Sequence, residues 1–111
     1  MSLIGKPPSR HLTAAEFAKE IPSWRRSGEQ DAANVMDPNE IEDELGAQPT
    51  PTTIKKWLLE QGSPPDVDDY LSVGVTATAE QKRVLHEAWA EGWASYAARY
   101  MRDHHPVEKE W

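Results

Sequence analysis

Apolar residues recur along this chain at the three- and four-residue spacing of an α-helix, and each recurrence begins at a recognisable capping residue. The first begins at Thr13, which can form a capping box with Glu16 three residues later. This pattern predicts a helix over about 13–21 that stops at Pro22, because proline removes a backbone hydrogen bond and clashes with the preceding turn. The pattern over 22–36 is weaker, and it leaves open a short helix or a mobile loop anchored by its tryptophan.

The same signals predict four more helices. They cover about 38–45, 51–61, 64–72 and 79–104, and all but the last begin with a proline in the first turn. Residues 72–78 are the one strand candidate, but their glycine and small side chains favour a linker. The chain is therefore expected to be all-α, a small bundle of four to five short helices packed on one long C-terminal helix.

Few apolar residues occur at either end of the chain. This predicts a flexible N-terminus over 1–10 and a flexible C-terminus over 106–111, around a single helical domain over 11–105. With 111 residues, the chain is long enough to bury a small core without a metal or a disulfide.

The predicted C-terminal helix carries four large aromatic residues on one side. At 100° per residue Trp89, Trp93, Tyr96 and Tyr100 fall within a wedge of about 60°, and Gly92 lies beside them. A helix over 79–104 spans about 39 Å, so it crosses the whole body or protrudes from it. The glycine indicates that a neighbouring helix approaches closely at that point.

This aromatic face admits four uses. A stripe at helical spacing is most often core, and the shorter helices can cover much of it. An uncovered end would instead contact a partner protein or a second copy of the chain, since Trp and Tyr are enriched at interfaces. The acidic or neutral flanking positions disfavour a base-stacking platform, and nothing specific supports a ligand cage.

Charge is distributed unevenly along the chain. The formal net charge is −7, and residues 28–72 alone carry eleven acidic against two basic residues. Such a surface repels phosphate and attracts basic partners, so nucleic-acid binding is disfavoured. Five acidic residues in and just before the predicted helix at 38–45 form the expected acidic patch: Asp37, Glu40, Glu42, Asp43 and Glu44.

Residue types that carry catalysis or bind cofactors are not arranged in any recognisable motif. The chain has no cysteine, and His86 has no second histidine four residues later for a zinc site. We therefore expect no catalytic residue, no metal ligand and no cofactor, and a protein that is not an enzyme. Without an apolar span or a signal peptide, it is expected to be cytoplasmic and to have no membrane partner.

Two segments resemble the halves of a DNA-binding motif. LTAAEFAKEI at 12–21 and PTTIKKWLLEQGSPP at 51–65 are similar to the helix-turn-helix of excisionases and MerR-type regulators. The resemblance implies that the second segment is a recognition helix whose DNA contacts are Thr52, Thr53, Lys55 and Lys56. The halves are separated by about thirty residues where the family has a short turn, so the chain departs from the family at the centre of the motif.

A second resemblance covers EAWAEGWASYAARY at 87–100, which is similar to segments near the C-termini of small proteins of actinobacterial phages. It implies a phage protein that acts in the host cytoplasm or contributes to the virion. The leading hypothesis is a non-enzymatic protein-protein interaction module that binds a host or phage partner through the acidic patch and the aromatic face. The alternatives are a small helix-turn-helix DNA-binding protein and a structural component of the virion.

Overall fold

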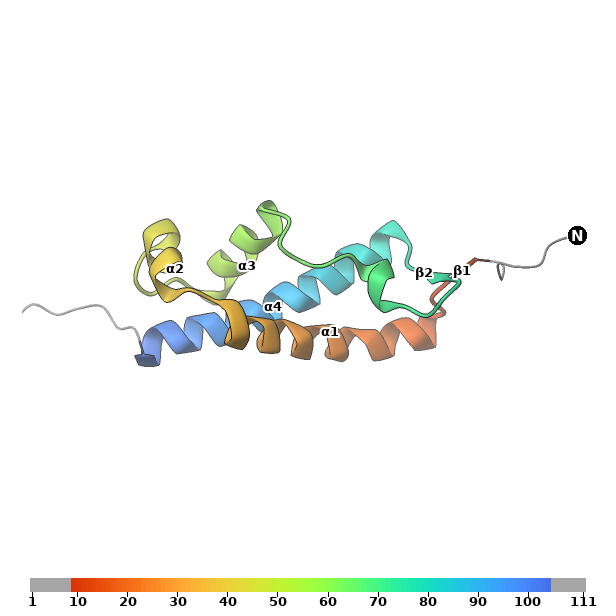
Figure 1. Cartoon of the computed structure of the whole chain (residues 1–111), viewed down its shortest axis with the longest axis horizontal. Coiled ribbons are helices and arrows are strands. Elements are labelled where there is room, and N and C mark those ends of the chain that lie inside the picture. The colour runs from red at the N-terminus through yellow and green to blue at the C-terminus, as the bar shows by residue number, and fades with distance from the viewer. Residues whose placement is uncertain (1–8, 105–111) are drawn as a thin grey trace, which may run out of the picture.

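The computed structural model describes residues 9–104 and shows an all-α chain in which a long C-terminal helix packs against the others (Figure 1). In chain order, the elements are β1 (Arg10–His11), α1 (Ala14–Val35), α2 (Pro38–Leu45), α3 (Pro51–Glu60), the 3₁₀ turn η1 (Val67–Tyr70), β2 (Val75–Thr76) and α4 (Ala79–His104). The predicted fold class is confirmed. The parts of the predicted flexible ends at 1–8 and 106–111 lie outside the described residues.

Two matching units, each a short strand followed by a capped helix, frame the fold. Strands β1 and β2 pair in parallel, and each leads directly into its helix. Thr13 Oγ1 accepts a hydrogen bond from the backbone N–H of Glu16 (3.1 Å), and Thr78 Oγ1 accepts one from Gln81 (3.0 Å). In both boxes the longer side chain accepts from the threonine N–H in return, which satisfies two otherwise unpaired donors at each helix start. The Gln81 amide also donates to the Leu12 carbonyl (3.1 Å) and so ties the two units together.

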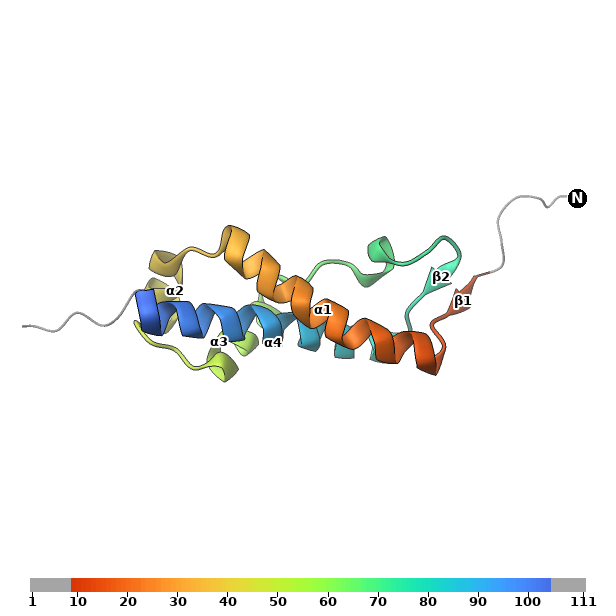
Figure 2. The ribbon, with the colours of Figure 1, turned by 90° about the horizontal axis from the view of Figure 1, so that it is seen from below.

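Helices α1 and α4 start at the same end of the molecule and cross in close contact (Figure 2). The contact centres on two buried glycines, Gly28 and Gly92. A Cβ atom on Gly28 would lie 2.0 Å from the carbonyl oxygen of Trp89, and one on Gly92 would lie 2.0 Å from that of Arg25. The expected close approach at Gly92 is therefore confirmed, and it is reciprocal.

Helix α1 does not stop at Pro22, so the predicted helix end was wrong. Pro22 is exposed, and the helix continues through Trp24, Gly28 and Ala32, which are buried at intervals of four residues. A proline within a helix costs about 3 kcal/mol, and burial of this repeat against the rest of the fold offsets that cost. Neither alternative offered for 22–36 is correct, because most of this segment is the second half of one long helix.

Two further predictions required correction near β2. Only η1 forms within the predicted helix at 64–72. Pro65 disfavours a helical conformation at Pro64, the Asp66 side chain caps the turn by accepting from Asp68 N (3.1 Å), and the backbone is extended again at Leu71. The predicted linker at 72–78 contains strand β2, whose partner strand includes Arg10 of the predicted flexible N-terminus.

The remaining short helices begin and end close to their predicted bounds. Asp37 and Thr50 cap α2 and α3, and Gly46 and Gly62 follow them with positive φ angles of 97° and 68°, which favour glycine. Together with η1 they lie on one side of the pair formed by α1 and α4 (Figure 1). Their buried residues complete a core whose largest fully buried side chains are Ile41, Ile54, Val67, Leu85 and Met101.

Candidate partner-binding groove

The predicted aromatic face divides into a buried part and a half-buried part. Trp89 and Trp93 are 4% and 6% exposed and belong to the core. Tyr96 and Tyr100 are half-buried and stack on each other with ring centroids 6.3 Å apart, and His104 follows 4.8 Å from Tyr100. Of the four aromatic residues predicted to contact a partner, only the two tyrosines therefore lie at the surface to an appreciable extent.

The predicted acidic patch surrounds helix α2, and all five of its residues are exposed. Asp37 and Glu40 face a pocket that lies between α1, α3 and α4. The rest of the patch (Glu42, Asp43 and Glu44) is not part of that lining. The structure therefore brings two of the predicted acidic residues next to the buried tryptophans of the aromatic face, which also line this pocket.

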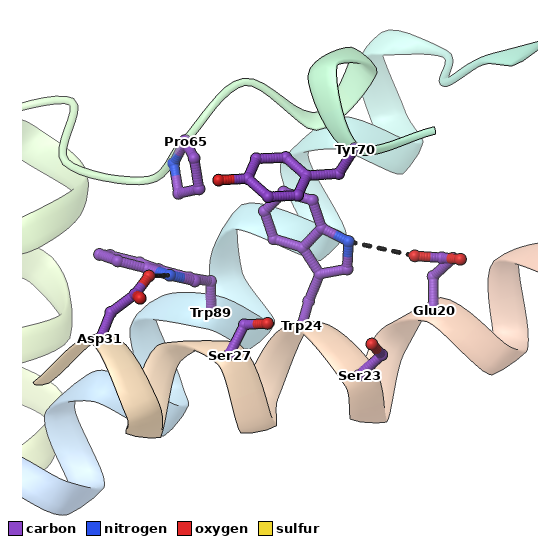
Figure 3. Close-up of a pocket in the computed structure, with 8 residues that line it drawn as sticks. All are labelled: Glu20, Ser23, Trp24, Ser27, Asp31, Pro65, Tyr70 and Trp89. Carbon is purple, nitrogen blue, oxygen red and sulfur yellow. Dashed lines mark hydrogen bonds between the residues drawn. The ribbon is translucent and has the colours of Figure 1, made fainter. Parts of the chain in front are cut away.

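A second pocket, of about 270 Å³, lies between α1, α4 and the segment that carries Pro65 and Tyr70. Figure 3 shows Glu20, Trp24 and Asp31 projecting into it from α1. Trp24 and Tyr70 meet edge to face, with ring centroids 5.6 Å apart. We call this the tyrosine pocket.

Two carboxylates stand at opposite ends of the tyrosine pocket (Figure 3), and each is held by an indole N–H. Trp24 Nε1 donates to Glu20 Oε1 (3.2 Å), and Trp89 Nε1 donates to Asp31 Oδ2 (2.9 Å). A carboxylate accepts up to about four hydrogen bonds, so each keeps an oxygen free for a ligand.

The pocket beside α2 has a volume of about 350 Å³ and shares Asp31 and Trp89 with the tyrosine pocket. The two pockets therefore adjoin, and we call them together the acidic groove. Within residues 9–104 three large hydrophobic residues are strongly exposed, and two of them line the groove, namely Tyr70 (68% exposed) and Val35 (70% exposed).

The acidic groove is lined by four carboxylates, those of Glu20, Asp31, Asp37 and Glu40. No lysine or arginine within 9–104 lines it, and none of the four forms a salt bridge with a residue in that range. A groove of this composition attracts cations and repels anions.

Ion pairs outside the groove fix its walls. Glu91 on α4 accepts from Arg25 on α1 (2.9 Å) and from Lys55 on α3 (3.0 Å), and so links three helices. The hydrogen bond from Arg25, with that from Lys55, holds the pKa of Glu91 below its usual value of 4.5, against the opposing effect of partial burial.

The segment above the tyrosine pocket is anchored to α4 in the same manner. The carbonyl oxygen of Pro65 lies 3.0 Å from His86 Nε2, and Asp68 pairs with Lys82 (3.0 Å). The hydrogen bond from Lys82 lowers the pKa of Asp68 below its usual value, so this ion pair persists to a lower pH.

Residues predicted as DNA contacts lie on helix α3. Thr52, Lys55 and Lys56 line one shallow depression, so the structure does bring them together. Thr53 instead joins the helix start, where its N–H donates to Thr50 Oγ1 (3.2 Å). The two segments that resemble a helix-turn-helix are separated by the second half of α1 and by α2, and helices α1 and α3 both pack on α4.

Across residues 9–104 no group of three or more His, Asp or Glu side chains is placed to hold a metal ion. Over the same range, none of the helices combines the length and the apolar character needed to cross a membrane.

Of the residues that line the tyrosine pocket, sequence reasoning predicted only Trp89 as a site residue. It missed Glu20, Ser27, Asp31 and Tyr70 among others, and used Trp24 only as the anchor of a loop. A usable signal was present, because Glu20, Trp24, Asp31 and Val35 follow one another at intervals of four, seven and four residues and so share one helical face. The prediction that the helix ends at Pro22 concealed it.

Comparison with known proteins finds no family model that matches the chain, and neither a curated protein nor a solved structure with significant similarity to it.

Proposed function

We propose that this protein is a non-enzymatic interaction module that binds a basic segment of a partner protein in the acidic groove. The observation that carries the proposal is the composition of this groove, in which four carboxylates lie among tryptophan and tyrosine side chains and no lysine or arginine of residues 9–104 joins the lining. A bound basic segment would neutralise these carboxylates and cover the exposed side chains of Val35 and Tyr70.

The dimensions of the groove suit a linear peptide. Its lining follows one face of α1 from Glu20 to Val35, a distance of about 22 Å along the helix axis. An extended peptide covers that distance with about six or seven residues. The other acidic residues of α2 add negative potential beside the groove and would speed the approach of a basic partner.

The proposal can be tested by selecting a displayed library of random peptides against the full chain. Enrichment of peptides that combine Lys or Arg with apolar residues is expected, with binding that weakens as salt is added. Selection of acidic or uncharged peptides would contradict the proposal.

A matched pair of variants locates the binding surface. The double variant Glu20→Gln with Glu40→Gln removes two charges from the groove. It is expected to weaken the binding of a selected peptide by about tenfold or more. Glu29→Gln with Glu60→Gln removes two charges from exposed positions outside the groove and should change the affinity little. Equal losses in the two variants would place the binding elsewhere.

DNA binding through α3 is a second candidate, favoured by the common depression that gathers Thr52, Lys55 and Lys56. It is the weaker one, because Lys55 is paired with Glu91 and the net charge is −7. A DNA shift that weakens steeply with salt and is abolished by Lys55→Glu with Lys56→Glu would support it.

Self-association is tested by sedimentation of the full chain. The surface available for it on the long helix is the half-buried end with Tyr96 and Tyr100. A dimer that Tyr100→Ala disrupts would favour a second copy as the partner of this surface. The phage setting and a role in the virion, implied by the segment at 87–100, stay predictions.

A further inference from the structure

We propose that the tyrosine pocket receives an arginine side chain of the basic partner, with its guanidinium against Asp31 and Ser27 and beside the rings of Trp24 and Tyr70. This inference rests on the proposed function and names the side chain that the groove recognises. All three groups line the same pocket, and Figure 3 shows Asp31 and Ser27 adjacent on α1 with the Tyr70 ring across from them.

Asp31 is held in place before a ligand arrives. Its Oδ2 accepts from Trp89 Nε1 (2.9 Å), and the Trp89 side chain is itself almost fully buried, so the position of the carboxylate is fixed by the core. Oδ1 stays available, and no cation within 9–104 neutralises the group. A preorganised, unneutralised carboxylate in a partly enclosed pocket binds a cation more strongly than one that water surrounds.

The polar groups of the pocket favour a donor-rich ligand. Its side chains offer two carboxylates and the hydroxyls of Ser23 and Ser27 as acceptors, whereas both indole N–H groups are already used by Glu20 and Asp31. A guanidinium presents five N–H donors in one plane, which can reach Asp31 and a serine hydroxyl together. An anionic or apolar side chain would leave these acceptors unpaired and poorly solvated.

Tyr70, together with Trp24, supplies an aromatic surface beside this site. It lies at the end of the short turn η1, the residue is 68% exposed, and its one ring contact within 9–104 is the edge contact with Trp24. Guanidinium groups stack on aromatic rings, whereas an ammonium group has no plane to stack. This difference is the basis for assigning arginine in place of lysine.

Glu20 stands eleven residues before Asp31 on the same face of α1, about 16 Å away along the axis. One guanidinium cannot reach both carboxylates. A second basic residue about five positions away in an extended partner would pair with Glu20.

The inference is tested by titrating the ¹⁵N-labelled full chain with acetyl-Gly-Arg-Gly-amide and following the indole N–H signals of Trp24 and Trp89. The arginine peptide should shift both signals saturably. The same peptide with citrulline, which keeps the shape but not the charge, should bind about tenfold more weakly or not at all. The assignment would be overturned if the lysine peptide, or the citrulline peptide, bound as tightly as the arginine peptide.

Variants then assign the contact. Asp31→Asn keeps an acceptor for Trp89 Nε1 but removes the charge. It should weaken the binding of the arginine peptide by about tenfold. Tyr70→Ala should weaken this binding severalfold. Glu29→Gln, on α1 but outside the pocket, should leave the affinity unchanged. An unaltered Trp24 indole signal in unliganded Asp31→Asn verifies that the pocket keeps its shape, because Trp24 Nε1 donates to Glu20 and not to the substituted residue.

The outcomes separate this inference from the proposed function. If the arginine peptide fails to bind, or binds Asp31→Asn equally well, while longer basic peptides still bind in dependence on Glu20 and Glu40, the arginine pocket is wrong and the groove proposal stands. If the longer peptides also fail, both are wrong.

Discussion

At the scale of single residues, Gly28 and Gly92 set the distance between the two long helices. Each faces the backbone of the other helix, and a backbone carbonyl cannot move aside as a flexible side chain can. Trp89 and Trp93, two of the tryptophans that line the acidic groove, lie on the same stretch of α4, so the shape of the groove depends on this crossing.

We therefore expect Gly28→Ala and Gly92→Ala each to lower the free energy of unfolding by more than about 2 kcal/mol, as measured by urea unfolding followed by circular dichroism. The clash has to exceed the gain of about 1 kcal/mol that alanine brings to a helix. Ser95→Ala, at an exposed position of α4, is the control and should change stability by less than about 0.5 kcal/mol. Tolerance of alanine at both glycines would contradict this crossing.

The ionisation of Glu16 makes the stability of the fold depend on pH. Its hydrogen bonds with Arg10, first of all, and with the backbone of Thr13 lower its pKa from 4.5 to about 2. Because the folded pKa lies below the unfolded one, the contribution to stability is present above pH 4.5 and is lost as the pH falls toward about 2.

The variant Glu16→Gln is expected to flatten this part of the stability curve, measured by chemical unfolding between about pH 2 and 6. The amide should preserve the capping box, since Gln81 fills the same position at the start of α4. Glu29→Gln is the control. If the stability of Glu16→Gln fell as steeply below pH 4.5 as that of the original chain, the role of Glu16 would be disproved.

At the scale of elements, α1 shows how burial overrides a local stop signal. The caps at Thr13, Asp37 and Thr50 could be recognised because a capping hydrogen bond involves residues two or three apart in sequence. The passage of α1 through Pro22 could not, because the residues that stabilise its second half are buried by a helix that lies about sixty residues later.

Replacing Pro22 with alanine should therefore raise the free energy of unfolding by about 1–3 kcal/mol, because the exposed site gains a backbone hydrogen bond and loses a steric clash. Thermal unfolding measures the effect. Pro38→Ala serves as control, since proline at the first position of α2 sacrifices no hydrogen bond. A loss of stability in Pro22→Ala would mean that α1 needs the proline to follow α4.

At the scale of the whole molecule, the distribution of charge links stability with binding. The net charge is −7, and the four carboxylates of the acidic groove are not neutralised by the described part of the chain. Binding sites commonly retain such unfavourable charge at the expense of stability.

Added salt should therefore stabilise the protein by up to about 1 kcal/mol between about 10 mM and 300 mM NaCl, as screening relieves this repulsion. The exposed ion pairs that salt weakens contribute less than about 1 kcal/mol each. The gain should be smaller in Glu20→Gln with Glu40→Gln than in Glu29→Gln with Glu60→Gln. A decrease in stability with salt would show that the ion pairs dominate.

The sequence by itself determined the helical class, the starts of the main helices and the long C-terminal helix, and it marked Gly92 as a point of close approach without identifying the neighbour. Each of these follows from residues within one or two turns of each other, where backbone geometry and capping act directly. The acidic patch was also visible, because charge density needs no folded coordinates.

Only the tertiary structure decided the continuation of α1, the pairing of β1 with β2, the burial of Trp89 and Trp93, and the acidic groove itself. In each case the partners are brought together from distant positions, as Asp31 is with Trp89, and the free energy of those contacts depends on which surfaces meet. Local patterns in the chain do not contain that information, because they fix the faces of an element but not the neighbour against which each face packs.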